Sequence, residues 1–336
     1  RWAGVVDSVG SFTLANAFLI SNTAANGDDR AALQANARWS ADFLALAQVF
    51  YNDTRLEAFY LDPDELPVVD SKTKLAGVNI ESRPIDGLML ASSYLTAVES
   101  DFSYFSPQGT VIGTRDGLNV FDARFTYMPN PPGQPGPFLG AEAALQTHRD
   151  FDMFATAGYG EIGYSFADTA WAPAISYRLG YFSGDDPDTD TYERWDPLYS
   201  GGNGEQWVQG ANHFKIVQDS NVIAHRIQGR FRPLPRVEVV PQLWLFQADS
   251  LNNIGGNPAL STLSAKTYGY EINTTVKWFA SQNWYWTWCQ PCSRNREKRK
   301  TPLPTWTRSR APCNIITACA SSISTPCCSA WDARSE

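Results

Sequence analysis

Basic side chains stand at alternate positions in segments of this chain whose other positions are apolar. In residues 174–182, Ile175, Tyr177 and Leu179 share one parity, whereas Arg178 has the opposite parity. Successive side chains of a β-strand point to opposite faces, so this pattern predicts a strand with one apolar and one polar face. A guanidinium on the polar face could bind a carboxylate or another anion.

The same parity rule collects further charged residues on polar strand faces. Such residues could line a pore that selects anions, in which acidic neighbours hold the basic side chains in place and prevent a ligand from binding too tightly. They could also pair with one another and simply fill a polar interior. The basic set is Arg38, Arg124, Arg178, Arg226, Arg230 and Lys277, and the acidic set is Asp122, Glu142, Glu161 and Glu271.

A long acidic loop follows the strand that contains Arg178. Asp186, Asp188 and Asp190 have the spacing of a calcium-binding loop. However, Thr191 stands where an EF-hand loop needs glycine, and Pro197 stands where it needs a bidentate glutamate. The sequence therefore favours a solvated loop over an ion site.

The sequence predicts no enzyme activity, no cofactor and no metal centre. It contains no nucleophile elbow, no HExxH motif and no P-loop. His148, His213 and His225 are scattered, and a packed or interfacial role suits His225. Cys289 and Cys292 form half of a zinc-binding pattern that the remaining cysteines do not complete.

Composition limits the class of protein. The chain has 336 residues, a net charge of -8 and no apolar run of the roughly 18 residues that a membrane-spanning helix requires. A mean hydropathy of -0.31 is still compatible with a membrane β-barrel, because only alternate strand residues contact lipid. The acidic balance argues against a nucleic-acid partner.

About a dozen alternating segments of roughly eight to twelve residues follow one another, joined by short turns and longer polar loops. No βαβ spacing interrupts them, and aromatic residues lie near the expected strand ends, as in the interfacial girdles of membrane barrels. The pattern predicts an all-β fold, namely a single antiparallel up-and-down transmembrane β-barrel. A soluble β-sandwich is the alternative interpretation.

The alternation stops abruptly after Trp288. The following residues contain all six cysteines and are rich in proline and arginine. We therefore expect a barrel domain at residues 1–288 and an irregular tail at residues 289–336, which would suit out-of-frame translation. The chain begins at Arg1 without a signal segment, so we interpret it as a fragment or mature form.

Motifs at both ends of the acidic loop resemble the alginate-export family of outer-membrane barrels. The likeness extends over residues 3–288 and includes the Tyr-Arg-x-Gly-Tyr-Phe run that begins at Tyr177. Relative to the family, the chain lacks part of the N-terminal strands and the closing C-terminal strand, so the barrel would be incomplete at both ends. The loop residues that carry the resemblance are Ser183, Gly184, Asp185, Asp186, Trp195, Asp196, Pro197 and Leu198.

This resemblance implies a channel in the bacterial outer membrane. An anionic polysaccharide, such as an alginate-like uronate polymer, would pass through an Arg-lined pore by export or diffusion, and the acidic loop would fold near the pore mouth. Lipid and polysaccharide would be the partners, with periplasmic secretion partners that the sequence does not identify. A general porin for small solutes and a soluble β-rich carbohydrate-binding domain are the alternative functions.

Overall fold

The computed structural model of the chain is all-β in the residues that it describes. These are residues 43–63, 70–131, 133–198, 219–256 and 260–280, together with the backbone of residues 284–295, 315–322 and 325–331. Arg38, one of the predicted pore-lining residues, lies outside them. Within the described residues, no helix is long and apolar enough to cross a membrane.

Most of the alternating segments of the sequence form strands. Their bounds are β1 (Phe43–Tyr51), β2 (Thr54–Asp62), β3 (Lys74–Ile85), β4 (Leu88–Glu99), β5 (Ser103–Phe105), β6 (Val111–Thr114), β7 (Leu118–Tyr127), β8 (Gly136–His148), β9 (Ala155–Ser165), β10 (Ala174–Phe182), β11 (Val222–Leu234), β12 (Val237–Gln247), β13 (Thr267–Phe279), β14 (Trp284–Asn295), β15 (Ile315–Ser322) and β16 (Thr325–Trp331).

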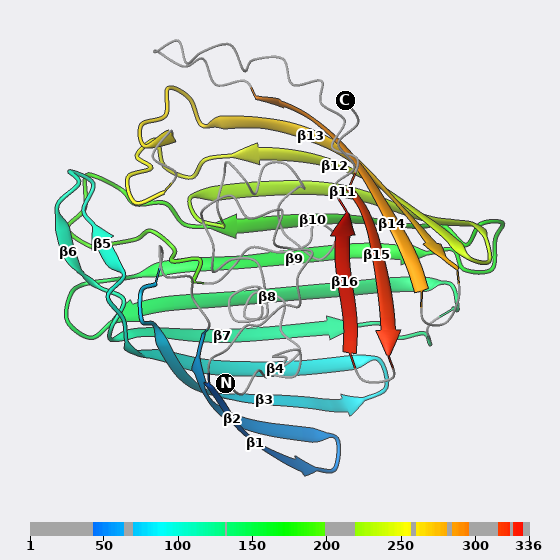
Figure 1. Cartoon of the computed structure of the whole chain (residues 1–336), viewed down its shortest axis with the longest axis horizontal. Helices are drawn as coiled ribbons and strands as arrows, with labels where there is room; N and C mark the ends of the chain where they lie inside the picture. The colour runs from blue at the N-terminus through cyan, green and yellow to red at the C-terminus, as the bar shows by residue number, and fades with distance from the viewer. Residues whose placement is uncertain are drawn as a thin grey trace.

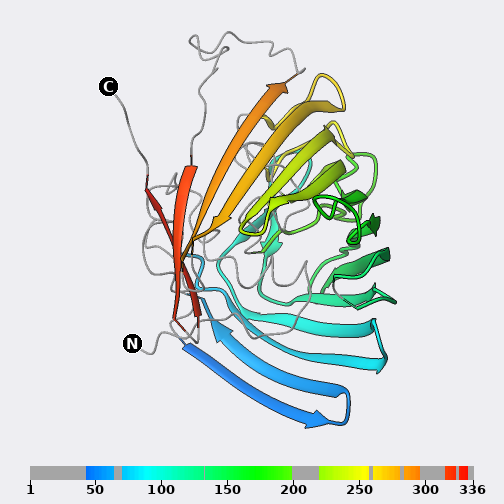
Figure 2. The same cartoon turned by 90° about the vertical axis from the view of Figure 1, so that its right-hand side faces the viewer.

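Fourteen of these strands form one antiparallel sheet in which sequence neighbours are also spatial neighbours. The only departure is the separate β5–β6 hairpin, which is inserted between β4 and β7. The sheet curls into a barrel-like wall, and its last strands turn back across the concave side (Figures 1 and 2). The predicted up-and-down antiparallel topology is confirmed. Within the described part of the chain, β1 and β16 do not pair, so the wall is not closed.

The two faces of the wall have the opposite character from those of a soluble protein. On β10, Ile175 is 54% exposed on the convex face, whereas Ser176 on the concave face is only 5% exposed. Ile162, Ile227 and Ile272 are likewise exposed on the convex face of their strands. A soluble sandwich buries its apolar faces, whereas a membrane barrel presents them to lipid. The exposed apolar face therefore excludes the sandwich and identifies the lipid-facing surface.

The concave face changes character along the strands. At the end where the long connections lie, its side chains are apolar and include Leu118, Phe182 and Phe246. Tyr104 from the β5–β6 hairpin and Trp195 from the β10–β11 loop join the same cluster. Towards the short turns, the buried concave residues are mainly charged or amide side chains. The interior is therefore apolar and loop-filled at one end and charged along the rest of its length.

One strand departs from simple alternation. The sequence pattern predicts Tyr268 on the apolar outer face together with Tyr270, but Tyr268 is buried on the inside. A register shift between β12 and β13 at Phe246 and Gln247 changes the parity at the start of β13. The Tyr268 hydroxyl then donates a hydrogen bond to the Asn221 carbonyl at 3.2 Å.

The expected domain boundary after residue 288 remains a prediction. Strand β14 begins before this position and ends at Asn295, and its backbone pairs with β13 from Tyr285 onwards. Strands β15 and β16 continue the same antiparallel order. The described backbone therefore includes strands within the part of the chain that the sequence pattern interprets as an irregular tail.

We predict that an arginine on the convex face will destabilise the protein far more than one on the concave face. Ile227→Arg should lower the free energy of unfolding in lipid vesicles by about 2–4 kcal/mol, because it places a charge in hydrocarbon. Gln228→Arg, at the adjacent concave position, should cost less than about 1 kcal/mol. Urea titration followed by gel mobility measures both values. Equal losses would contradict the assignment of the faces.

Candidate functional site

Three charged side chains form a row across the concave face of β9, β10 and β11. In the strand register, Arg178 is directly opposite Glu161 on one side and Arg226 on the other. Arg226 Nη2 donates to Glu161 Oε1 at 2.6 Å, and Arg178 Nε donates to Oε2 of the same carboxylate at 2.8 Å. Arg178 Nη2 also donates to Oε2. One carboxylate is therefore shared by two guanidinium groups.

Aromatic rings support both guanidinium groups of this row. The Arg178 guanidinium carbon lies 4.7 Å from the ring centroid of Tyr159, and that of Arg226 lies 5.6 Å from the centroid of Trp244. Such cation–π contacts restrict where a guanidinium can move. Arg178 Nη1 and Arg226 Nε have no hydrogen-bond partner in the described structure. Both atoms are buried, and the more exposed of the two basic side chains is Arg178, which is 12% exposed.

A second basic group lies nearer the short turns on the concave side. The Glu238 carboxylate of β12 is 3.2 Å from Arg232, 3.8 Å from Lys277 and 3.9 Å from Arg230. The Arg230 and Arg232 side chains are at least half exposed, whereas Glu238 is buried. Here again several cations surround one carboxylate.

The arginine on β7 has a different environment. Arg124 Nη1 donates to Asp122 at 2.6 Å and to Ser93 at 2.9 Å, and its Nη2 donates to Asn79 at 2.7 Å. Glu142 of β8 stands opposite Arg124 in the register. Acidic and amide groups therefore surround this cation, which is nearly unexposed.

The concave wall is thus divided by charge. On β2 to β8, three arginines accompany four carboxylates, whereas on β9 to β13 five cations accompany three carboxylates. The first sector contains Arg55, Arg83 and Arg124 with Glu57, Glu81, Asp122 and Glu142. The second sector contains Arg178, Arg226, Arg230, Arg232 and Lys277 with Glu161, Glu238 and Glu271.

The parity rule placed the predicted residues on the correct face wherever the structure describes them. All the predicted basic residues except Arg38, which is not described, and all four predicted acidic residues belong to the concave face. Glu161 joins Arg178 and Arg226, whereas Arg124 joins Asp122 in a separate cluster. Their role in binding an anion stays a prediction.

Other charged residues were missed, although the same rule could have found them. Arg55 is 3.0 Å from Glu81 and 3.5 Å from Glu57, and all three occupy concave positions. Arg232 and Glu238 form the second basic group described above. Each of these residues lies in a segment whose alternation is visible in the sequence. The parity rule therefore applies to them, and the set of predicted pore-lining residues was incomplete.

The acidic loop folds onto the concave side rather than extending away from the strand ends. Trp195 is fully buried against Phe182 of β10, with ring centroids 6.4 Å apart. Ser183 anchors the start of the loop, because its Oγ donates to the Glu193 carbonyl at 2.6 Å and accepts from the Thr156 N–H at 2.9 Å. Gly184, Asp185 and Leu198 are also buried, whereas Asp186 is exposed.

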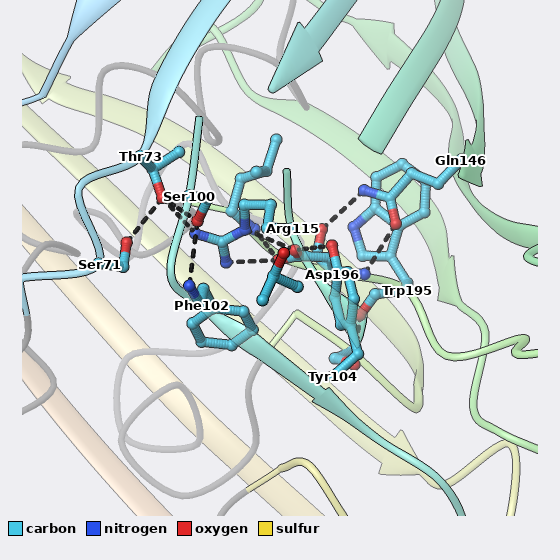
Figure 3. Close-up of polar contacts among 12 residues, drawn as sticks. Ser71, Thr73, Ser100, Phe102, Tyr104, Arg115, Gln146, Trp195 and Asp196 are labelled. Atoms are coloured by element: carbon cyan, nitrogen blue, oxygen red, sulfur yellow. Dashed lines mark hydrogen bonds and ion pairs between the residues drawn. The ribbon is translucent and has the colours of Figure 1, made fainter. Parts of the chain in front are cut away.

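Asp196, in the described part of this loop, makes several hydrogen bonds (Figure 3). Its carboxylate accepts Arg115 Nε at 2.7 Å, Arg115 Nη2 at 2.9 Å and the Tyr104 hydroxyl at 2.6 Å. Burial raises the pKa of Asp196, but the charge and hydrogen bonds of Arg115 and the hydrogen bond from Tyr104 outweigh it and lower the pKa below its usual range. Burial, followed by the charge of Asp196, holds the pKa of Tyr104 well above its ordinary value.

The exposed aspartates of the loop make local contacts. Asp186 Oδ1 accepts the Asp188 N–H at 3.0 Å, which is a turn interaction. Across the described residues, no group of three His, Cys, Asp or Glu side chains has the geometry to hold a metal ion. His225 lies on the convex face and contacts the Tyr177 hydroxyl at 2.8 Å, whereas His213 is not described.

Comparison with known proteins gives one match to a family. A family model described as alginate export matches residues 27–287. No curated protein sequence matches the chain.

Two solved structures follow a similar course of the chain. OccK3 (OpdO) of Pseudomonas aeruginosa has a TM-score of 0.46 and 12% sequence identity, covering 75% of this chain and 64% of its own. Wzi of Escherichia coli, described as a carbohydrate-binding β-barrel involved in group 1 capsule assembly, has a TM-score of 0.44 and 10% identity. That match covers 78% of this chain and 59% of Wzi. The chain thus spans less than two thirds of the length of either protein.

A buried carboxyl at the end of the β10–β11 loop predicts a pH dependence. Burial raises the pKa of Asp219 from 3.8 to about 7. Between pH 3.8 and about pH 7, Asp219 is protonated in the folded protein but ionised in the unfolded chain. The free energy of unfolding should therefore fall as the pH rises through this window, by about 1.4 kcal/mol per pH unit, and then level off.

The Asp219→Asn variant isolates this contribution, because every other carboxyl is shared with the wild-type protein. We expect the difference in unfolding free energy between the two proteins to change between pH 5 and pH 7 and to be constant above about pH 7.5. Urea titrations in vesicles measure it at each pH. A constant difference across the whole range would contradict the raised pKa.

Proposed function

The chain belongs to the alginate export family of bacterial outer-membrane transport proteins, and from that premise we propose that it conducts an anionic polysaccharide. The polymer would be an alginate-like uronate, and its passage would be passive export or diffusion. Its carboxylates would follow the basic sector of the concave wall. The partners are then membrane lipid on the convex face and the polysaccharide inside. The proposal includes no covalent step.

The observation that carries this proposal is the sharing of Glu161 by Arg178 and Arg226. Two cations and one carboxylate leave an excess positive charge, and each guanidinium retains an N–H without a protein acceptor. This excess charge would attract a passing carboxylate towards the Arg178 side chain, which is 12% exposed, and a hydrogen bond to a charged donor is stronger than a neutral one. Because Glu161 competes for the same guanidinium groups, the passing anion would be held weakly enough to leave.

The basic group around Glu238 would supply a second contact site for the polymer. Arg226 and Arg232 are six residues apart on β11, which corresponds to roughly 20 Å along a strand. A chain with a carboxylate on every sugar could contact both groups at once, whereas a small monovalent anion contacts one. Repeated weak contacts along one side favour a polymer over its monomer.

A general porin for small solutes is the second candidate. It is favoured by the Arg124 cluster, in which acidic and amide groups already satisfy the cation. If the β9–β13 sector behaved in the same way, its charges would only fill the interior. Electrical measurements distinguish the two functions, because only the first predicts preference for anions and block by uronate oligomers.

We predict that Arg178→Gln/Arg226→Gln will weaken block by uronate oligomers about tenfold, equivalent to about 1.4 kcal/mol of binding free energy. Glu161→Gln should do the reverse and increase the preference for anions, because it removes the only carboxylate of the row. Planar-bilayer conductance, reversal potentials and titrated block by oligomers measure these effects.

Arg149→Gln provides a matched control, because Arg149 is an exposed loop residue that pairs with Asp150 at 3.1 Å. Uronate oligomers should block the Arg149→Gln channel as strongly as they block the wild-type channel. Heat-dependent gel mobility identifies variants that have not folded. Equal block by neutral oligosaccharides of the same length, in the wild-type channel, would refute the assignment of Arg178 and Arg226 and favour the general porin.

A further inference from the structure

The β10–β11 loop crosses the inside of the wall. Asp196 in this loop contacts Gln146 of β8 twice, since its N–H donates to Gln146 Oε1 at 2.8 Å and its carbonyl accepts from Nε2 at 2.8 Å. Strand β9 lies between β8 and β10 in the sheet. The loop must therefore pass over β9 on the concave side to reach Gln146, which brings it across the space that a solute would use.

Both flanks of this crossing segment are docked. The Trp195 N–H donates to the Ser183 carbonyl at 3.1 Å, and Ser220 Oγ donates to the Trp195 carbonyl at 2.6 Å. Arg194 is buried, and its Nη1 donates to Asn253 Oδ1 at 2.8 Å. Among the described residues 183–198, the acidic tip at residues 186–190 is the exposed part. This part of the loop therefore combines an exposed tip with a buried base.

One ion pair joins this base to the connection between β6 and β7. Arg115 and Asp196 are each only 3% exposed and form two hydrogen bonds with each other (Figure 3). The Arg115 N–H donates to the Phe102 carbonyl at 2.8 Å, and Arg115 Nη1 donates to Thr73 Oγ1 at 3.3 Å. The pair thus connects the loop to the segments before β3 and after β4.

Loss of either partner would leave a buried charge without its counterion. Such a loss is strongly unfavourable, and the simplest relief is movement of the loop to bring the remaining charge to water. The Arg149–Asp150 pair at the same end of the molecule is different, because both side chains are about 60% exposed. Exposed pairs contribute little to holding two segments together.

We propose that the Arg115–Asp196 pair is a tether that holds the base of the β10–β11 loop across the lumen and thereby sets the width of the passage. Arg115 and Asp196 are positioning residues, because both are buried and act on a solute only through the placement of the loop base. The inference rests on the proposed channel function and adds the element that limits the size of what passes. It does not depend on which solute the basic sector selects.

Asp196→Asn tests the tether with two independent readings on the folded protein in bilayers or detergent. Trypsin cleavage after Arg194, identified by the masses of the fragments, reports release of the loop base. Single-channel conductance and exclusion of neutral polymers of graded size report the width. We expect new cleavage at Arg194, about a twofold rise in conductance and entry of larger polymers.

Further variants serve as controls for the Asp196→Asn experiment. Asp150→Asn removes the exposed pair at the same end and should behave as the wild type in both readings. Tyr104→Phe removes one hydrogen bond to Asp196 and keeps the pair, so it should give a smaller change in the same direction. If Asp196→Asn does not fold, Arg115→Gln breaks the same pair from its other side, and unchanged cleavage and width in the folded Arg115→Gln variant would then overturn the tether.

Each possible result for Asp196→Asn supports or overturns one of two claims, namely that the pair tethers the loop and that the tether sets the width of the passage. Cleavage at Arg194 without a wider passage would overturn the role in width, and a passage that changes without cleavage would overturn the tether. No change in either reading would overturn both. Reversal potentials separate this test from the proposed function, since a wider channel that shows no anion preference would refute the polysaccharide role and leave the tether intact.

Discussion

The structure depends on the requirement that one face of the wall meets hydrocarbon while the backbone hydrogen bonds of its strands are made inside the sheet. Antiparallel neighbours satisfy the backbone of the interior strands, so the side chains alone decide which face contacts which environment. The convex face is apolar for this reason, and the polar residues must collect on the concave face. Charge that would be costly in a soluble core is thus concentrated where it can pair.

Two different interiors follow from this arrangement. Near the long connections, apolar concave residues pack with loop side chains such as Tyr104 and Trp195, and the Arg115–Asp196 pair supplies the fully paired charge among them. Further along the strands, Glu161 and Glu238 each contact more than one cation. The apolar region near the long connections is filled by packed side chains, whereas the region further along the strands carries the charge of the interior.

Strand order and the face of each charged residue on β9 to β11 could be predicted from the sequence, because a period of two is local information. The Tyr268 assignment was wrong because a register shift at Gln247 leaves no trace in the alternation. The contacts of Asp196 could not be predicted at all, since Arg115 is 81 residues away and both partners lie in connections without periodicity. The sequence also shows that two arginines share a face, but not that they share one carboxylate.

The wall and the tether differ in the distance along the chain that their contacts bridge. Each strand pairs with a sequence neighbour, so hairpins can be added one after another with little loss of chain entropy. Arg115 and Asp196 can meet only after β7, β8, β9 and β10 have assembled. The narrowing that we propose for this tether therefore requires four assembled strands, whereas each hairpin of the wall requires only two.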